Sequence, residues 1–548
     1  MNRRKFLFSS AGIAASFAQP RSRRPNVILI LTDDQGFGDL SIHGNEKIQT
    51  PNMDRIAREG LQFTQFHVSP VCSPTRSSLL TGRYNYRTGV VDTYLGRSLM
   101  WPDETTLAEA LGGAGYRTGI FGKWHLGDNY PMRPGDQGFA ESVVIKGGGL
   151  GQPSDFPGGG SYTDPILLRN GRAENFKGYC TDIFAREAIR YIETNKDRPF
   201  FLYLATNAPH TPLEIDEKYV GPFRKAGLDD VTAKVYGMIA NVDENIGRVL
   251  AKLKDLKLEE NTILIFLTDN GPQQKRFNAG MRGQKGTVYE GGIRVPCFVR
   301  WPRAVKPGSK VDRLAAHIDV FPTLLEACGV SAPKNVKLDG RSLLPLLRDP
   351  ASDWPDRTIF FQWHRGDTPE LYRDCAARNQ RWKLLNGRAL YDLENDPAES
   401  KDVSAEHADI VAGLRRQYEA WFSDVSATRG FQPSRPIIGT AHENPVILTR
   451  QDWRGRSAGW VDGSLGYWEV NVAVAAQYEF RVRIPPSKAA GTARLELNGA
   501  SLEVAYQVGA TDIEMGRTTV RAGEGRLEAE LESGGVKSGA HYVTVRKL

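Results

Sequence analysis

Two short acidic segments of the chain could together hold a divalent cation. Asp33 and Asp34 follow one apolar run, and Asp269 and Asn270 follow another of the same kind. Three carboxylates and an amide oxygen are donors that Ca²⁺ or Mg²⁺ prefers, whereas Zn²⁺ favours histidine or thiolate ligands. Either pair alone is typical of a turn or a helix cap. A metal site is therefore expected only if the two runs end side by side.

A segment that begins with Cys72 could bind an anion. Ser73 is a good N-cap, so a short helix is predicted over residues 75–80, ended by Gly82. Cys72 then lies at a helix N-terminus, where backbone N–H groups and the helix dipole stabilise negative charge. Arg76, one turn further on, adds a planar fork of donors that can hold two oxygens of a tetrahedral oxyanion.

Four more basic residues lie near predicted strand ends or glycine-rich loops. Lys123 and His125 are two residues apart, so an extended segment would place them on one face. His210 follows the apolar run 199–204, and Lys285 lies between two glycines. Taken singly, each is typical of a solvated strand end or a structural loop. They indicate a functional site only if the fold brings them close to the acidic segments.

Together these segments resemble the signatures of type I sulfatases, arylsulfatase-like members of the alkaline phosphatase superfamily. Cys72-Ser73-Pro74-Thr75-Arg76 is similar to the family motif C-x-P-x-R, in which the cysteine is oxidised to formylglycine (3-oxoalanine), and residues 115–127 resemble the second signature. The resemblance implies metal ligands Asp33, Asp34, Cys72, Asp269 and Asn270, catalytic residues Cys72, Arg76, Lys123, His125, His210 and Lys285, and substrate contacts from Arg76, Lys123, His210 and Lys285.

The resemblance also implies a reaction, the hydrolysis of a sulfate monoester to an alcohol and inorganic sulfate. One hydroxyl of the formylglycine hydrate attacks sulfur after Asp269 takes its proton, and His210 or Lys285 protonates the leaving oxygen. The second hydroxyl then loses its proton to His125, which releases sulfate. Ca²⁺ is expected ahead of Mg²⁺. A sulfatase-maturating enzyme is the implied partner during biosynthesis, and sulfated polysaccharides or oligosaccharides are the expected substrates.

Two other functions fit the same residues. A phosphoesterase of the same superfamily would use a metal, a nucleophile and several cations equally well. A non-catalytic protein that binds sulfated glycans would keep Cys72 as an unmodified thiol. The complete set of proton-transfer residues favours the enzyme over the binding protein. The relative rates on matched aryl sulfates and phosphates would distinguish the two enzymes.

The elements that must position these residues indicate an α/β fold. Residues 26–32 and 261–268 are continuously apolar, which is typical of strands covered on both faces in a parallel sheet. Open α/β sheets place their sites at the carboxyl ends of such strands. The resemblance implies a large mixed, mostly parallel sheet flanked by helices over residues 21–350, followed by a small α+β subdomain over residues 351–430.

An appended all-β sandwich is predicted over residues 436–548. Apolar and polar residues alternate there in segments separated by glycine-bearing turns. Trp453, Trp460 and Trp468 are expected in its core, with a carbohydrate-stacking surface as the alternative. The glycine-rich segment 146–165 is predicted to be a plain surface loop, with an edge of the active-site mouth as the alternative. In the small subdomain, His364, Arg365 and Tyr372 are further candidate substrate contacts.

Composition and the N-terminus indicate an exported protein. Residues 1–20 have a basic start and an apolar run, which predicts a signal peptide of either the twin-arginine or the ordinary secretory type, and a periplasmic or extracellular protein. No other window is long and apolar enough for a stable membrane span. The net charge of +7 is spread without a basic run, so nucleic acid is not an expected partner. The five cysteines show no paired spacing, and no disulfide is assigned.

Overall fold

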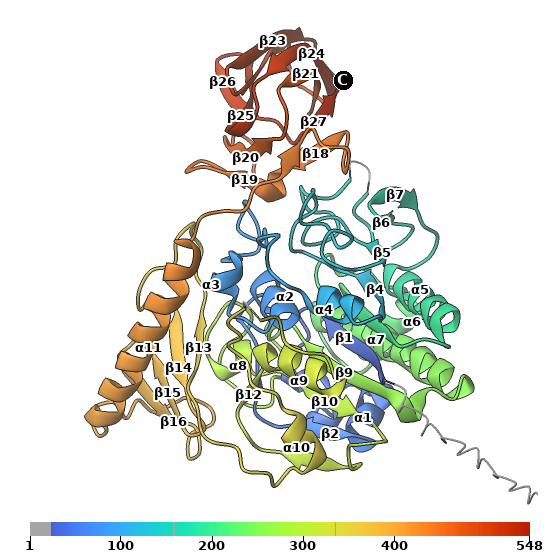
Figure 1. The fold of residues 1–548 in the computed structure, drawn as a ribbon, viewed down its shortest axis with the longest axis vertical. Coiled ribbons are helices and arrows are strands. Elements are labelled where there is room, and N and C mark those ends of the chain that lie inside the picture. Colours follow the sequence, from blue (N-terminus) through green and yellow to red (C-terminus); the bar gives the residue numbers. More distant parts are fainter. Residues whose placement is uncertain (1–23, 157–158, 335) are drawn as a thin grey trace, which may run out of the picture.

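The computed structural model describes residues 24–156, 159–334 and 336–548 (Figure 1). The predicted signal peptide, residues 1–20, lies outside the described residues. Within the part of the chain that is described, none of the helices has both the length and the apolar character to cross a bilayer. All five cysteines are buried as free thiols.

A ten-stranded mixed sheet forms the centre of the larger part of the molecule. Its central strands run parallel, and the strands at both ends include antiparallel pairs. In spatial order the strands are β11 (Ser309–Val311), β2 (Leu61–Phe63), β10 (Cys297–Arg300), β9 (Thr262–Thr268), β1 (Asn26–Thr32), β8 (Phe200–Ala205), β4 (Arg117–Gly122), β5 (Glu141–Val144), β6 (Ile166–Arg169) and β7 (Arg172–Asn175).

The continuous apolar runs fold as predicted. Every residue of β1, β8 and β9 is buried, because helices cover both faces of the sheet. β1 pairs in parallel with β9 from Asn26 to Thr32, so that Thr32 lies opposite Thr268. β8 pairs with the other edge of β1 and also with β4. The carboxyl ends of these four strands therefore meet at one edge of the sheet.

Two groups of helices enclose the sheet. Successive strand residues enter different cores: Val27, Leu29 and Leu31 pack on one side, and Ile28 and Ile30 on the other. The first side carries α2 (Cys72–Thr81), α4 (Leu107–Gly113), α9 (Val320–Ala327) and α10 (Leu344–Arg348). The second carries α1 (Pro51–Arg58), α5 (Cys180–Asn195) and α7 (Asp230–Asp255), with α6 (Glu217–Lys225) packed on α7. Short elements complete this part: α3 (Asn85–Thr88), α8 (Glu290–Ile293) and the two-stranded sheet of β3 (Phe66–His67) and β12 (Ala315–Ala316).

A small antiparallel sheet follows, with one long helix against it. The strands are β13 (Ile359–Gln362), β14 (Cys375–Arg378), β15 (Trp382–Leu385) and β16 (Ala389–Asp392), and the helix is α11 (Ala408–Arg429). The sequence predicted this α+β unit. Sequence reasoning missed β14, whose Cys-Ala-Ala-Arg sequence lacks the β-branched and aromatic residues typical of strands.

The C-terminal region is the predicted all-β sandwich. One sheet contains β17 (Ile437–Ile438), β20 (Tyr467–Val472), β25 (Gly523–Ser533), β22 (Gly491–Leu497) and β23 (Ala500–Tyr506), with β19 (Trp453–Arg454) and β26 (Val536–Gly539) at its side. The other contains β18 (Val446–Thr449), β27 (Tyr542–Lys547), β21 (Ala476–Arg483) and β24 (Asp512–Val520). Trp453 and Trp468 are fully buried between the sheets, which confirms their assignment to the core.

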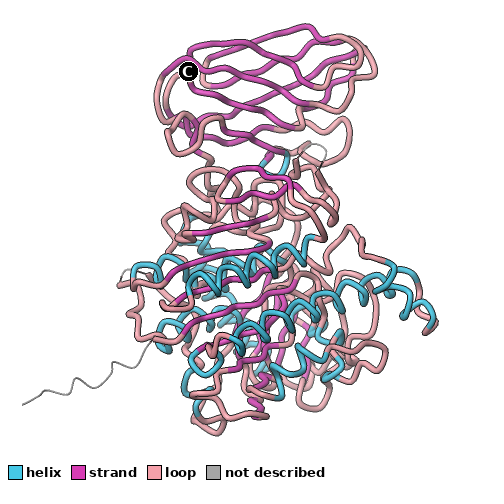
Figure 2. The backbone as a smooth tube through the Cα atoms, turned by 90° about the vertical axis from the view of Figure 1, so that its right-hand side faces the viewer, coloured by secondary structure: helices cyan, strands magenta, loops and turns pink. Residues whose placement is uncertain are grey.

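The sandwich stands at one end of the molecule (Figure 2), next to the loop that joins α3 to α4 (Figure 1). Leu95 of this loop is 5% exposed and packs into the hydrophobic core of the sandwich. The neighbouring Gly96 donates its N–H to the Gln451 carbonyl at 2.8 Å and accepts a hydrogen bond from Arg454 at 3.0 Å. The two parts therefore share a core residue, and the sandwich is anchored close to the carboxyl edge of the large sheet.

Candidate active site

The ends of β1 and β9 bring the two acidic segments together. Asp34 has a left-handed backbone, with φ of 64°, and this turn directs its side chain back across the strand end. Its N–H donates to Asp269 Oδ1 at 3.2 Å, and its Oδ1 accepts a hydrogen bond from Asn270 Nδ2 at 2.8 Å. Asp33 lies beside it and is also fully buried. The predicted convergence of the two pairs is thus present in the structure.

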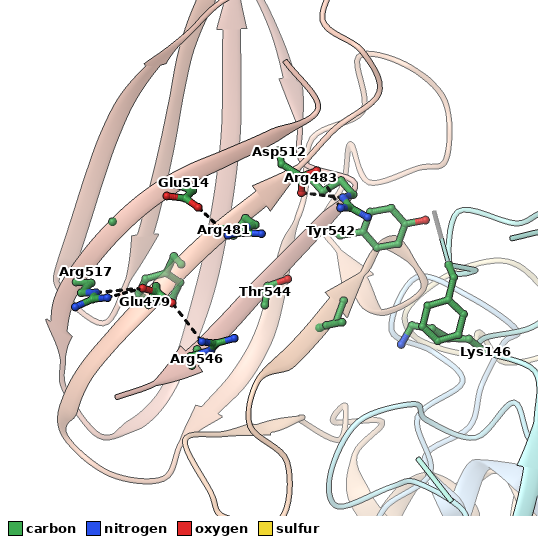
Figure 3. Close-up of a pocket in the computed structure, with 14 residues that line it drawn as sticks. Lys146, Glu479, Arg481, Arg483, Asp512, Glu514, Arg517, Tyr542, Thr544 and Arg546 are labelled. Carbon is green, nitrogen blue, oxygen red and sulfur yellow. Dashed lines mark hydrogen bonds and ion pairs between the residues drawn. The ribbon is translucent and has the colours of Figure 1, made fainter. Parts of the chain in front are cut away.

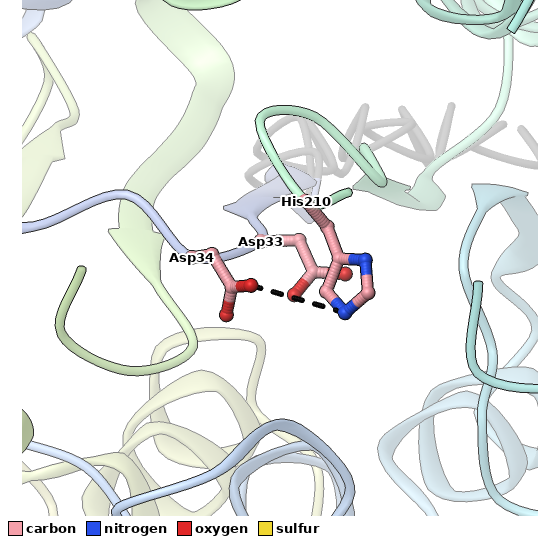
Figure 4. A group of neighbouring side chains, drawn as sticks. All are labelled: Asp33, Asp34 and His210. Atoms are coloured by element: carbon pink, nitrogen blue, oxygen red, sulfur yellow. Dashed lines mark ion pairs between the residues drawn. The ribbon is translucent and has the colours of Figure 1, made fainter. Parts of the chain in front are cut away.

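Three oxygen atoms of this cluster are buried without a hydrogen-bond partner. They are Asp33 Oδ1, Asp34 Oδ2 and Asn270 Oδ1. Buried polar atoms are almost always paired, because an unpaired one forfeits its hydration. Carboxylate and amide oxygens left free in this way have the chemistry of ligands for a hard cation. One side of the cluster is closed by His210, whose Nε2 lies 3.8 Å from Asp34 Oδ2 (Figure 4).

Three cationic side chains oppose the three carboxylates: Arg76 and Lys123 are buried, and Lys285 is half-buried. Lys123 Nζ lies 2.6 Å from Asp33 Oδ2, and Lys285 Nζ lies 2.6 Å from Asp34 Oδ1. Burial alone would raise the pKa of Asp33, but Lys123, His210 and Arg76 hold that pKa far below its usual range. Burial and repulsion by Asp33 raise the pKa of Asp269 to about 7, although Arg76 and Lys123 oppose this shift. The cluster is therefore a balanced set of strongly interacting charges.

Arg76 is committed to protein groups in the structure. Its Nη2 lies 2.8 Å from Asp269 Oδ2, and its Nη1 donates to the Lys123 carbonyl at 2.9 Å. The buried Nε has no partner. The guanidinium thus ties α2 to the ends of β9 and β4, whereas the sequence suggested a direct contact with an oxyanion.

Cys72 is the first residue of α2, which corrects the predicted start of this helix. Val71 is the N-cap, and Ser73 lies inside the helix with its hydroxyl donating to the His125 carbonyl at 2.9 Å. The predicted end at Gly82, which is left-handed, is confirmed. Cys72 remains at a helix N-terminus, and its Sγ lies within 4.8 Å of carboxylate oxygens of Asp33 and Asp269. Burial raises the pKa of its thiol.

His125 faces Cys72, but not for the reason that the sequence suggested. β4 ends at Gly122 and His125 has a φ of 61°, so Lys123 and His125 do not lie on one face of an extended strand. Its Nε2 lies 2.7 Å from the Thr93 carbonyl. A carbonyl only accepts, so Nε2 carries the proton and Nδ1 presents a lone pair to Cys72 Sγ at 3.5 Å. Burial, with Lys123 and Arg76, lowers the pKa of His125 well below its usual value.

All ten predicted site residues therefore lie in one connected cluster, and sequence reasoning missed several that support it. Arg276 pairs with Asp39 at 2.6 Å and donates to the Asp34 carbonyl at 2.9 Å, which fixes the turn after β1. Gln451 of the sandwich approaches His125. Gly148 and Gly149, in the predicted loop 146–165, pass over the two histidines, so this part of the loop borders the site.

The group suggested in the small subdomain lies outside this cluster. His364 is buried and accepts a hydrogen bond from the Glu370 N–H at 2.9 Å. Tyr372 packs against Tyr418. Arg365 is half exposed, contacts Asp92 at 2.9 Å and stacks on Tyr94. Only Arg365 thus reaches the loop that carries Thr93.

A separate cleft of about 500 Å³ runs along the outer face of the sandwich, beside Lys146 (Figure 3). Its charged side chains pair across neighbouring strands, as Arg481 does with Glu514 and Arg483 with Asp512. These arginines are already neutralised within the sheet. The buried cluster at the strand ends is the better candidate for chemistry on an anion.

Comparison with known proteins agrees with this site. The sequence profile of the Sulfatase family matches residues 25–330, more than half of the chain. The chain belongs to the sulfatase family. It is a sulfuric ester hydrolase, and a second profile, N-sulphoglucosamine sulphohydrolase, C-terminal, matches residues 283–422.

Relatives of this sulfatase include two human enzymes. N-acetylgalactosamine-6-sulfatase of Homo sapiens is 35% identical over 389 residues, covering 65% of this chain and 71% of the relative. Arylsulfatase A of Homo sapiens is 33% identical over 426 residues, covering 71% and 79%. The solved structure of Ps i-CgsB in complex with k-i-k-neocarrahexaose is similar, with a TM-score of 0.66, 31% identity, and coverage of 75% of this chain and 94% of that one.

The covering loop yields a prediction for this sulfatase. A Cβ at Gly148 would lie 2.5 Å from His125 Nε2 and 2.7 Å from Cε1. We expect Gly148→Ala to displace the loop or the ring and to lower turnover of an aryl sulfate by about tenfold to a hundredfold, as misplaced reacting groups do. Gly413→Ala, at an open position in α11, is the control and should keep full turnover. Equal activity of both variants would show that the loop does not fix His125.

Proposed function

We propose that this sulfatase cleaves sulfate monoesters of carbohydrates with a formylglycine formed at position 72 and a Ca²⁺ ion beside it. The observation that carries the proposal is the placement of Cys72 between the free Nδ1 of His125 and the carboxylate cluster. A nucleophile at this point has a proton acceptor on one side and cation ligands on the other. Mg²⁺ is the second choice of ion.

The proposed metal ligands are Asp33, Asp34, Asp269, Asn270 and the modified side chain at position 72. The three unpartnered oxygens of the cluster fit this role. A bound Ca²⁺ would lower the pKa of a hydroxyl and disperse negative charge. The charges of the three carboxylates and the three cationic side chains cancel. A bound Ca²⁺ would therefore give the site a net positive charge, which favours the binding of an anionic ester.

The remaining residues have proposed roles in binding and proton transfer. Lys123, Lys285, Arg76 and His210 offset the charge of the sulfate group, the first two with ammonium groups that now contact carboxylates. His125 accepts a proton at Nδ1, since Nε2 is held by Thr93. Lys285, or His210 in its protonated form, supplies the proton to the leaving oxygen. The Nδ1 atom of His210 contacts the Thr211 carbonyl at 2.6 Å, which directs Nε2 into the site.

Carbohydrate is the proposed substrate class. The relative named N-acetylgalactosamine-6-sulfatase and the similar structure with bound neocarrahexaose support it. The proposal includes export through the N-terminal segment. It also includes a maturating enzyme, which must reach Cys72 before the chain closes around it, because this residue is only 2% exposed in the fold.

Removal of the metal tests the ligand set. We expect dialysis against a chelator to abolish sulfate release, and Ca²⁺ to restore it more fully than Mg²⁺. Asp34→Ala should require much more Ca²⁺ for the same activity, measured by titration calorimetry and by rate, because it deletes an oxygen that has no other partner. Glu193→Ala, which deletes an exposed carboxylate of α5 outside the cluster, is the control. Full activity in the absence of divalent cations would refute this part of the proposal.

The chemical state of position 72 tests the nucleophile. Mass spectrometry of the peptide that contains Cys72 from active protein should show the loss of sulfur and the gain of oxygen that mark formylglycine. The other four cysteine peptides should remain alkylatable after unfolding. An alkylatable thiol at position 72 in fully active protein would contradict the proposal, and an inactive protein of this kind would favour the glycan-binding alternative.

The leaving group tests the reaction class. A matched pair of aryl sulfate and aryl phosphate should be cleaved with the larger kcat/KM on the sulfate, as expected for a member of the sulfatase family. A panel of defined sulfated saccharides should then give sulfate release above that from the aryl ester. Faster cleavage of the phosphate would favour the phosphoesterase alternative.

A further inference from the structure

The β-sandwich contributes a side chain to the surroundings of His125. Gln451 lies in the short helix η5 (Arg450–Asp452), between β18 and β19, and is 3% exposed. Its Nε2 donates to the Thr93 carbonyl at 2.8 Å and to Ser98 Oγ at 3.1 Å. The same atom lies 3.3 Å from His125 Nε2. An element far from the family signatures thus reaches the candidate base.

The Thr93 carbonyl accepts hydrogen bonds from both side chains. His125 Nε2 approaches it at 2.7 Å and Gln451 Nε2 at 2.8 Å, and a carbonyl oxygen has two lone pairs for two such donors. This carbonyl determines which nitrogen of His125 carries the proton and how the ring is turned. Whatever fixes the carbonyl therefore fixes the lone pair that faces position 72.

The loop that carries Thr93 is held to the sandwich at the residues that follow. Tyr94 packs edge to face on Trp460, with 5.0 Å between the ring centroids. Leu95, two residues after Thr93, is buried in the sandwich core. Gly96 is bound at both its N–H and its carbonyl by residues 451 and 454. Three successive residues of this loop are thus fixed by the sandwich, beside the carbonyl that holds His125.

We propose that Gln451 is a positioning residue for His125, and that the sandwich is a working part of the active site. This inference rests on the proposed function, in which His125 accepts a proton at Nδ1. Gln451 touches neither the substrate nor position 72. It acts by holding the Thr93 carbonyl, and through it the ring of His125, in the orientation that the proton transfer needs.

The experiment is a double-mutant cycle in the full chain, co-expressed with a maturating enzyme. The variants are Gln451→Leu, Gln451→Glu, His125→Ala and the double variant that combines Q451L with H125A. Rates on an aryl sulfate are divided by the fraction of protein with formylglycine, measured by mass spectrometry. Gln477→Leu, at an exposed position of the sandwich, is the matched control.

We expect Q451L to lower kcat by about tenfold to a hundredfold, the usual effect of losing a group that orients a catalytic side chain, with KM unchanged. In the H125A background Q451L should have no further effect, because the group that it positions is gone. The isosteric Q451E should also lower kcat, since it cannot donate to a carbonyl. If thermal melting shows that Q451L is unfolded, the kcat of Q451E tests the inference in its place.

Three results would overturn the inference. Full kcat in Q451L or in folded Q451E would show that the contact is dispensable. An equal loss in the wild-type and H125A backgrounds would show a general structural role. Wild-type kcat in H125A would remove the proposed role of His125 and this inference with it, whereas an impaired H125A beside a fully active Q451L refutes the inference alone.

Discussion

The parallel pairing of β1 with β9 is the constraint on which the rest of the site depends. Because Thr32 lies opposite Thr268, both strands end at the same level. The three carboxylates and the amide that follow them therefore lie close together in the protein interior. Such a concentration of negative charge away from water is unfavourable unless cations accompany it. Arg76, Lys123 and Lys285 meet this requirement from three other elements. The fold therefore has to bring α2, β4 and the glycine loop to the same edge.

The same balance explains why so few site residues are exposed. Each charge is held by a partner of opposite sign, and backbone turns at Asp34 and His125 direct side chains inward. The turn after β1 is itself held by the buried pair of Asp39 and Arg276. Rigid support of this kind is what pre-organised electrostatic catalysis requires. The loop with Gly148 completes the enclosure above the histidines.

Sequence reasoning predicted the apolar strands and the C-terminal sandwich from the periodicity and type of the residues, whereas it expected the convergence of the acidic segments from the resemblance to sulfatases. It placed the start of α2 too late, since Ser73 is a better N-cap by type than Val71. It expected strand alternation to place Lys123 and His125 on one face, whereas β4 ends at Gly122 and His125 has a left-handed backbone. The contact between Gln451 and Thr93 lies beyond such reasoning. A backbone carbonyl has no signature in the sequence, and 358 residues separate the partners.

The insertion of Leu95 into the sandwich core has a consequence for the engineering of this chain. A side chain shared by two cores cannot be assigned to either module, so a chimera that exchanges the C-terminal unit at residue 436 would leave Leu95 without its pocket. A chimera that contains this C-terminal unit would also need the segment from Asp92 to Ser98 of this chain. Exchange of the C-terminal unit alone would therefore leave Leu95 either exposed to water or facing a pocket that does not fit it.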